Sequence, residues 1–180
     1  MIVRALRIDS GCPWMLVSLL FIASCDSQQA QNQFEDDAGQ TPSGIVRTTD
    51  DGRIAVDGSG KEIENDLDDW RTAPNFAGVV RFDPAYPNPT AGDLVTVTVL
   101  VQQFNSLSGG LVLRGYDDTG RLIRLDELPQ ATQPGSFTFV FSPRQFSVAG
   151  DLGVASGLHR VFVFDVRGEI VSYGDILVES

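Results

Sequence analysis

The chain contains very little cysteine and histidine, and this scarcity limits the chemistry open to it. Only Cys12 and Cys25 are present, and no cysteine follows residue 25. A disulfide framework and a cysteine-ligated metal site are therefore excluded for the later part of the chain. His159 is the single histidine, whereas a zinc site needs several histidine or cysteine ligands. We expect no metal and no cofactor.

A catalytic constellation is also missing from the sequence. No Gly-x-Ser-x-Gly turn offers a serine nucleophile to the lone histidine. Asp117 and Asp118 are adjacent, as are Asp126 and Glu127. Neighbours on a strand point to opposite faces, so neither pair would share a substrate. We predict that the protein is not an enzyme. A carboxylate pair drawn from distant positions, as in glycosidases, stays open as an alternative.

Positive charge is scarce. The chain has 13 basic and 24 acidic residues, a formal net charge of −11. This charge repels nucleic-acid phosphates, so we expect no nucleic-acid binding. It also repels anionic lipid headgroups, and any hold on a membrane must therefore be hydrophobic or covalent. The hydrophobic content of 42% suits a globular protein, and 11 Phe supply large side chains for a core.

The N-terminus has the order of a secretory signal. Arg4 and Arg7 give a positive start, and an apolar run follows from Trp14 to Ala23. This run is too short to span a membrane, which takes about 20 residues. Its length and its position after a basic start fit a signal peptide. We predict a signal peptide over residues 1–24.

The run ends in Ile22-Ala23-Ser24-Cys25. An aliphatic residue, two small residues and a cysteine resemble the lipobox of bacterial lipoproteins. The resemblance implies cleavage before Cys25 and acylation of that residue, including palmitate. Two or three acyl chains anchor a protein stably, whereas one binds only marginally. The protein would then be held in the bacterial cell envelope by lipid on Cys25, with the domain outside the cytoplasm. The inner and outer membranes both stay open.

Two regions precede the strongest strand patterns. Residues 25–43 are rich in Gln, Asp and Asn and poor in apolar side chains, which predicts a flexible tether. Residues 44–76 form an acidic segment with short candidate strands at Gly44–Arg47 and Arg53–Val56. Its carboxylates fit no register of a calcium-binding EF-hand loop. We expect Trp70, which ends the acidic stretch, to pack against the edge of the domain.

Residues 77–180 carry period-two alternation, as in Val95–Val99 and Phe137–Phe141. Alternation of this kind indicates half-buried strands. Seven short strands separated by turn residues predict an all-β sandwich of immunoglobulin or fibronectin type. The candidate strands are Gly78–Phe82, Leu94–Gln102, Leu111–Tyr116, Arg121–Leu125, Ser136–Phe141, His159–Val166 and Ile170–Val178.

Two predicted hairpins repeat one pattern. Tyr116–Ile123 and Phe164–Val171 both read aromatic, Asp, two variable residues, Gly, one polar residue and two aliphatics. The glycine allows a positive φ, and the aspartate can hydrogen-bond the turn backbone.

A further resemblance covers roughly residues 84–180. Tyr86-Pro-Asn-Pro89, an aromatic-Asp-x-x-Gly hairpin and Gly157-Leu-His-Arg-Val-Phe-Val163 resemble the C-terminal sorting domains of type IX-secreted proteins. The resemblance implies a sandwich whose first strand opens at the proline motif. The chain departs from that family at its end, Gly174-Asp-Ile-Leu-Val-Glu-Ser180, which lacks the usual basic residue before the last strand. A lipidated N-terminus would also conflict with release by that route.

The sequence therefore predicts a lipid-anchored envelope protein with a non-catalytic sandwich for binding or assembly. A type IX-like sorting or cargo module is the first alternative, and a carbohydrate-binding or hydrolytic domain is the second. The membrane, reached through lipid on Cys25, is the one expected partner. Sheet edges would suit a protein partner that adds a strand, and an exposed face carrying both Trp70 and Tyr86 would suit a binding platform.

Overall fold

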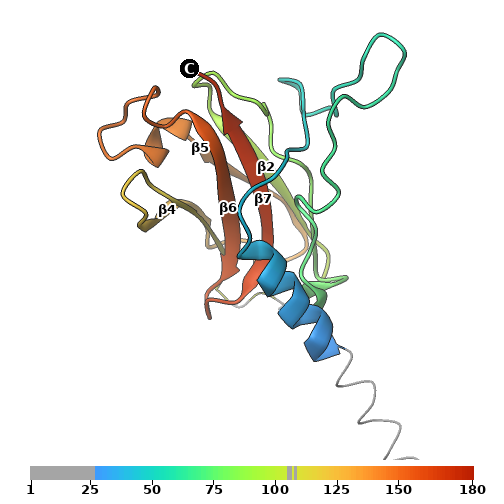
Figure 1. Cartoon of the computed structure of the whole chain (residues 1–180). Helices are drawn as coiled ribbons and strands as arrows, with labels where there is room; N and C mark the ends of the chain where they lie inside the picture. The colour runs from blue at the N-terminus through green and yellow to red at the C-terminus, as the bar shows by residue number, and fades with distance from the viewer. Residues whose placement is uncertain (1–26, 105–106, 108) are drawn as a thin grey trace, which may run out of the picture.

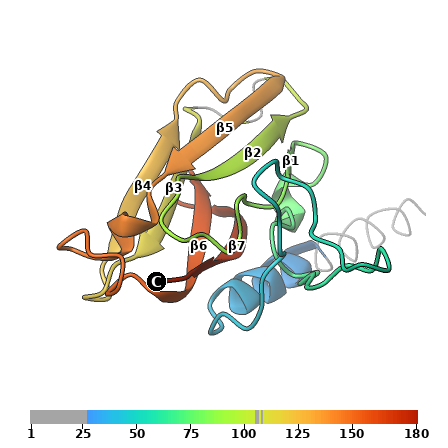
Figure 2. The same cartoon turned by 90° about the horizontal axis from the view of Figure 1, so that it is seen from above.

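Seven strands form two antiparallel sheets, one in the order β1-β2-β5 and the other in the order β4-β3-β6-β7 (Figure 1). The computed structural model describes residues 27–104, 107 and 109–180. Seen from above, the two sheets face each other as the layers of a sandwich (Figure 2). The prediction of an all-β sandwich is confirmed. The strands are β1 (Val80–Phe82), β2 (Val95–Val101), β3 (Leu111–Tyr116), β4 (Leu122–Leu128), β5 (Gly135–Phe141), β6 (Gly157–Asp165) and β7 (Ile170–Val178), with 3-10 helices η1 (Pro74–Phe76) and η2 (Pro143–Phe146) in the connections.

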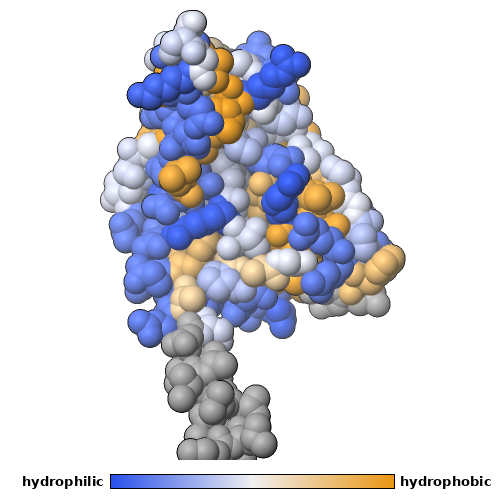
Figure 3. Space-filling view, turned by 90° about the vertical axis from the view of Figure 1, so that its right-hand side faces the viewer, coloured by the Kyte–Doolittle hydropathy of each residue, from blue (hydrophilic) through white to orange (hydrophobic). Residues whose placement is uncertain are grey.

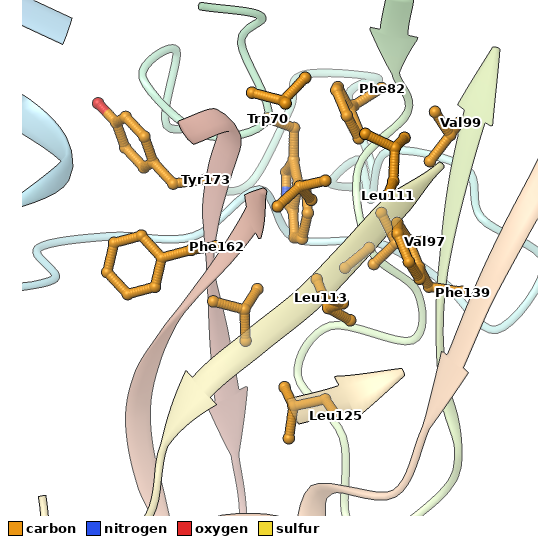
Figure 4. Packing of buried hydrophobic residues seen from close by; sticks show 14 of the residues in the cluster. Trp70, Phe82, Val97, Val99, Leu111, Leu113, Leu125, Phe139, Phe162 and Tyr173 are labelled. Carbon is orange, nitrogen blue, oxygen red and sulfur yellow. The ribbon is translucent and has the colours of Figure 1, made fainter. Parts of the chain in front are cut away.

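Alternation along each strand builds the core between the sheets. In β2 every second residue is buried, and these residues are all valines. They face the large buried side chains of the neighbouring strand and of the opposite sheet, among them Phe139, Leu111 and Leu113 (Figure 4). β-Branched and aromatic residues fit this pleated, half-buried surface. The inward faces of the two sheets thus interdigitate, as in other sandwiches.

The two repeated hairpins are present, and their turns are alike. In the β3–β4 turn, the Asp117 carboxylate accepts the backbone N–H groups of Thr119 and Arg121. In the β6–β7 turn, Asp165 accepts those of Arg167 and Glu169 in the same way. Gly120 and Gly168 occupy the left-handed region, with φ of 77° and 85°, which favours glycine. Each aspartate therefore fixes its own hairpin.

The first described segment forms a helix over residues 27–38. The prediction of a flexible tether over residues 25–43 is wrong for this helix. Gln31, Phe34 and Ala38 lie one helical turn apart and are buried. Phe34 packs on the Tyr173 ring with centroids 5.1 Å apart. The side chain of Gln31 bonds Glu35 within the helix and the backbone N–H of Asn75 outside it, which satisfies the buried amide. Burial of this narrow stripe orders the segment.

Residues 44–66 form an irregular segment, drawn in teal to green, that projects from the sandwich (Figure 1). The expected short strands are present only as isolated bridges, such as Thr48 with Ile54 and Val46 with Asn65. Val56 and Ile63 are exposed apolar residues of this segment. The face of the molecule seen in Figure 3 carries separate hydrophobic patches between hydrophilic residues. The paired stretches are too short to form a regular ladder.

Residues 69–90 cover the outer edge of β7. The N–H groups of Trp70 and Ala73 donate to the carbonyls of Tyr173 and Val171. The side chain of Asn88 bonds both the Asp175 carbonyl and the Leu177 N–H and thereby imitates a paired strand. This explains why β7 is buried along almost its whole length.

Trp70 lies inside the sandwich and not on an exposed platform. Only 4% of its surface is exposed, and its ring lies against Gly174 of β7. Figure 4 places it on the same side of the sheet as the core residues. A binding face shared by Trp70 and Tyr86 is therefore excluded.

Candidate functional site

The outer face of the β4-β3-β6-β7 sheet carries a row of aromatic side chains. Phe162 and Tyr173 lie on the side of the sheet away from the core (Figure 4). The ring of Phe162 contacts Tyr116 edge-on and Phe164 at a tilt, each with centroids 6.0 Å apart. Alternation accounts for this row, because the residues between Phe162 and Phe164 and on either side of Tyr173 point inward. The aromatic side chains of this sheet therefore gather on its outer face, whereas its inner face is aliphatic.

The N-terminal helix covers only part of this row. Phe34 packs over Tyr173, whereas Tyr116, on the neighbouring side, keeps 49% of its surface exposed. Leu122 of β4 is exposed next to it. The row therefore divides into a part sealed by the helix and a part open to solvent.

Two adjoining hollows lie along the border between the helix and the open aromatic residues. The larger measures about 270 Å³ and the smaller about 190 Å³. They share Gly39, Tyr116 and Phe162. We call the two together the aromatic groove. Its size lies at the lower end of the range for small-ligand sites. Its remaining walls are Glu35, Ala38, Gln40, Pro42, Leu122, Leu158, His159, Arg160, Phe164 and Ile170.

Arg160 fixes one wall of the aromatic groove. Its guanidinium pairs with Asp175 through two contacts of 2.8 and 2.9 Å. Its third nitrogen donates to the carbonyl oxygens of Asp37 and Gln40, at 3.0 and 2.8 Å, where the helix ends. A cation at this end of a helix is favourable because the last carbonyls point outward without partners. Arg160 therefore holds the helix and has few donors left for a ligand.

Arg71 holds the helix from its other side. Its guanidinium donates to the Asp37 carboxylate at 2.6 Å and to the Tyr173 hydroxyl at 2.8 Å. It also lies over the Phe34 ring, 5.3 Å from the centroid. The Arg71 contact lowers the pKa of Asp37. Ring stacking and ion pairing thus act together to hold the helix against the sandwich.

Arg114 is the cation best placed to meet a ligand. It is exposed on the outer face of β3, and its guanidinium lies 5.5 Å from the centre of the Phe164 ring. Stacking of this kind leaves the edge of the guanidinium open to an acceptor. An exposed arginine that stacks on the half-buried Phe164, near the exposed Tyr116, suits a ligand with a flat apolar part and a negative group.

Asp69 and Asp175 form a buried acidic pair behind the helix. The Asp69 carboxylate accepts the backbone N–H groups of Val46 and Asp175. Burial, followed by repulsion from Asp175 and Asp66, raises the pKa of Asp69 to about 8. Burial also raises the pKa of Asp175, although Arg160 opposes this change. These carboxyls join the 44–76 segment to β7 and do not open into the aromatic groove.

The His159 ring is held by a stacking contact and a hydrogen bond within the domain. Its ring stacks on Phe146 with centroids 4.2 Å apart, and its Nε2 lies 2.7 Å from the Ala155 carbonyl oxygen. Burial lowers the pKa of His159, which favours the neutral ring. A neutral imidazole in this position donates its Nε2 proton to Ala155 and packs as a core side chain.

Two of the adjacent acids identified in the sequence, Asp118 and Asp126, accept hydrogen bonds from backbone N–H groups. Asp118 accepts the N–H of Val148, and Asp126 accepts the N–H of Val140 on β5. Glu127 pairs with Arg124. The structure brings none of these carboxylates into the aromatic groove. Within residues 27–104, 107 and 109–180, no three His, Cys, Asp or Glu side chains are grouped to hold a metal ion.

Cys25 and the lipobox Ile22-Ala23-Ser24-Cys25 lie outside the described residues. In the part of the chain that is described, no helix has the length and apolar character needed to cross a bilayer. No family model matches the chain, and no curated protein or solved structure is significantly similar to it.

Part of this site could be predicted from the sequence. Tyr116, Phe162 and Phe164 lie in strands that alternation predicted, and their outward direction follows from that period. Residues 27–40, which form the other wall, gave no such signal. The groove was missed because it exists only where the helix meets the sheet.

Proposed function

We propose that the chain is a lipid-anchored cell-envelope protein whose β-sandwich is a non-catalytic binding or assembly domain. The observation that carries the anchor is Ile22-Ala23-Ser24-Cys25 at the end of an apolar run with a basic start. After cleavage before Cys25 no other thiol would remain. The acidic charge leaves covalent lipid as the evident hold on a membrane.

The strand order supports a sandwich of the immunoglobulin or fibronectin kind. In immunoglobulin domains the first, second and fifth strands share a sheet, and the third, sixth and seventh share the other. The order β1-β2-β5 and β3-β6-β7 agrees with this arrangement. β4 lies beside β3, where variable-type domains add strands. Domains of this architecture commonly present binding surfaces.

The binding role rests on the aromatic groove. Tyr116 offers the groove an exposed aromatic surface, and Arg114, which lies beside the groove and stacks on its residue Phe164, offers a cation in a protein that is otherwise strongly acidic. Pockets that bind small ligands combine apolar walls with a few polar groups in the same manner. We propose that the natural ligand has an aromatic or other flat apolar part and an anionic group.

Metabolic labelling tests the anchor. Radiolabelled palmitate should enter the wild-type protein and the Cys12→Ala control, because Cys12 belongs to the removed signal. Cys25→Ala should incorporate no label and should be found in the soluble fraction. Palmitate incorporation that is unaffected by Cys25→Ala would refute the anchor.

The anionic aromatic dye ANS, which reports accessible apolar surface, tests the groove. The folded protein should enhance ANS fluorescence, and Tyr116→Ala and Arg114→Gln should each reduce this enhancement. Leu94→Ala, at an exposed apolar residue outside the groove, is the matched control. Equal dye binding by all four proteins would count against the groove as the binding site.

A type IX-like sorting role is the second candidate, favoured by the Tyr86-Pro-Asn-Pro89 motif and the hairpins that follow it. That role implies cleavage near residue 84 and loss of the C-terminal part. A C-terminal epitope tag that stays joined, in whole cells, to a second tag placed between Cys25 and residue 84 would exclude it. Separation of the two tags would favour it over the anchored binding domain.

A further inference from the structure

The helix that replaces the expected tether begins very close to the proposed anchor. It covers residues 27–38, so only Asp26 separates it from Cys25 in the sequence. Consecutive Cα atoms are 3.8 Å apart, which places the Cα of Cys25 within about 7.6 Å of the first helical residue. An extended tether over residues 25–43 would instead reach roughly 60 Å. Covalent geometry therefore makes the link to the lipid very short as long as the helix stays docked.

The docking contacts hold the helix from Gln31 to its C-terminal end. Phe34 has only 3% of its surface exposed and packs on Tyr173. Arg71 pairs with Asp37 at 2.6 Å, and Arg160 donates hydrogen bonds to the carbonyl oxygens at the helix end. Burial of the Phe34 side chain stabilises the docked position of the helix. These contacts fix the direction of the helix relative to the sheets.

The helix itself depends on this docking. An isolated helix of this length is marginal in water. Its acidic residues Glu35, Asp36 and Asp37 all lie in the last turn, where a negative charge opposes the helix dipole. Arg71 and Arg160 supply the compensating positive charge from the sandwich. Loss of docking would therefore unwind the helix and lengthen the link.

The helix begins at the end of the molecule opposite to the C-terminus. In Figure 1 it starts at the bottom of the view, whereas the C-terminus lies at the top. Residues 27–34, which form its first two turns, carry no charged side chain. Apart from Asp26, the start of the helix therefore brings no acidic side chain to an anionic headgroup layer, so it meets less repulsion than the rest of the acidic chain would.

We infer that the docked helix holds the sandwich against the lipid headgroups in one orientation, with the start of the helix facing the bilayer and the C-terminus pointing away. This inference rests on the proposed lipid anchor at Cys25. The partner surface is the headgroup layer of the membrane that receives the lipid. The aromatic groove, at the far end of the helix, is then held about 18 Å along the helix axis from that surface and stays open to ligands.

Site-directed labelling tests this orientation in the processed, lipidated protein. Its one natural thiol carries the lipid, so an introduced cysteine is the unique labelling site. Gln29→Cys lies at the exposed start of the helix and Ser180→Cys at the exposed C-terminus. Each variant is labelled with a fluorophore and reconstituted into phosphatidylcholine vesicles containing a headgroup nitroxide quencher. The label at residue 29 should be strongly quenched and the label at residue 180 weakly quenched.

Two variants serve as controls for the short link. A Gly-Ser linker as long as the helix, inserted between Cys25 and Asp26, should remove most of the difference between the two labels. Phe34→Ala combined with Arg71→Gln should reduce the difference by undocking the helix. Equal quenching at residues 29 and 180 in the otherwise unaltered protein, or a difference that the linker leaves unchanged, would overturn the inference.

Flotation of the protein with the vesicles distinguishes failure of the proposed orientation from failure of the proposed lipid anchor. A protein that floats with the vesicles but shows equal quenching keeps its anchor and loses the proposed orientation. A protein that does not float lacks the lipid, which overturns the proposed anchor and the orientation together.

Discussion

Arg160 shows how much of the arrangement depends on single residues. Its side chain is 9% exposed and connects β7, through Asp175, with the end of the N-terminal helix. A buried ion pair gains little net stability, because desolvation of both charges offsets their attraction. The N–H donors of Arg160 nevertheless point in fixed directions, so they can hydrogen-bond the carbonyl oxygens of the helix end in one position only. The residue therefore contributes specificity of docking more than free energy of folding.

Gly174 is a residue whose smallness is required. A Cβ at this position would overlap the ring of Trp70. Gly174→Ala should lower the free energy of unfolding by about 1–3 kcal/mol, as overpacking of a core does, and urea unfolding measures it. Gly58→Ala, at a position with open space around it, should change it by less than about 0.5 kcal/mol. Equal stability of the two variants would show that Trp70 moves aside freely.

The raised pKa of Asp69 predicts that the free energy of unfolding falls at neutral to mildly alkaline pH. Its pKa is about 8 in the folded protein, against an ordinary value of 3.8. Between these values the folded form holds a proton that the unfolded chain has lost. Stability should therefore fall as the pH rises toward 8, by up to about 1.4 kcal/mol per pH unit. Above pH 8 the effect should level off.

Urea unfolding between pH 6.5 and 8 tests this effect in a suitable window. At lower pH, the lowered pKa of His159 acts in the opposite direction, because the unfolded chain then binds the extra proton. Asp69→Asn should flatten the slope, even though the substitution lowers stability overall by leaving one N–H poorly paired. An equal slope in wild type and variant would exclude Asp69 as its source.

At the scale of elements, the strands could be predicted from the sequence and the helix could not. β3 and β7 have the predicted bounds, and the ends of the other strands lie within three residues of the predicted ones. Alternation shows which side chains are buried, and it is less informative about where a strand ends. β4 extends through Asp126 and Glu127 to Leu128, beyond the predicted end at Leu125. The helix buries Gln31, Phe34 and Ala38, a stripe with one large apolar residue. Its stability comes from Arg71 and Arg160, which lie far along the chain.

Phe34→Ala should undock the helix while leaving the sandwich folded. Truncation of a buried Phe costs about 3 kcal/mol or more, which corresponds to roughly hundred-fold faster amide exchange. Hydrogen exchange should therefore accelerate over residues 31–38 and stay unchanged in β2 and β5. Gln29→Ala, on the exposed side of the helix, is the control and should exchange as the wild type does. Uniform acceleration in both sheets would instead mean that the helix and the sandwich unfold together.

At the scale of the whole molecule, the segments before β1 belong to the same core as the sandwich. Phe34, Val46 and Trp70 are members of one buried cluster with the strands. Residues 69–73 also supply hydrogen bonds to the edge of β7. The sequence patterns divide the chain at residue 77 because the alternation is stronger after this point. The residues on the two sides of this boundary nevertheless pack in one shared core.

Truncation tests the shared core. A chain of residues 77–180 loses Trp70 and the partners of the β7 backbone, so we expect it to be unfolded or aggregated by circular dichroism and gel filtration. A chain of residues 27–180 should unfold in one cooperative transition. A 77–180 chain with the stability of the longer one would show that the preceding segments are accessory.

The Asn88 side chain and residues 69–73, which occupy the free edge of β7, have a consequence for crowded copies of the protein. An open edge strand is a template onto which another chain can add its own strand, and repetition of that step produces fibres. On β7 the template positions are taken by the molecule's own backbone and by one amide side chain. Neighbouring molecules that meet at high density along this edge therefore find no row of unpaired groups, and this edge offers no starting point for polymerisation.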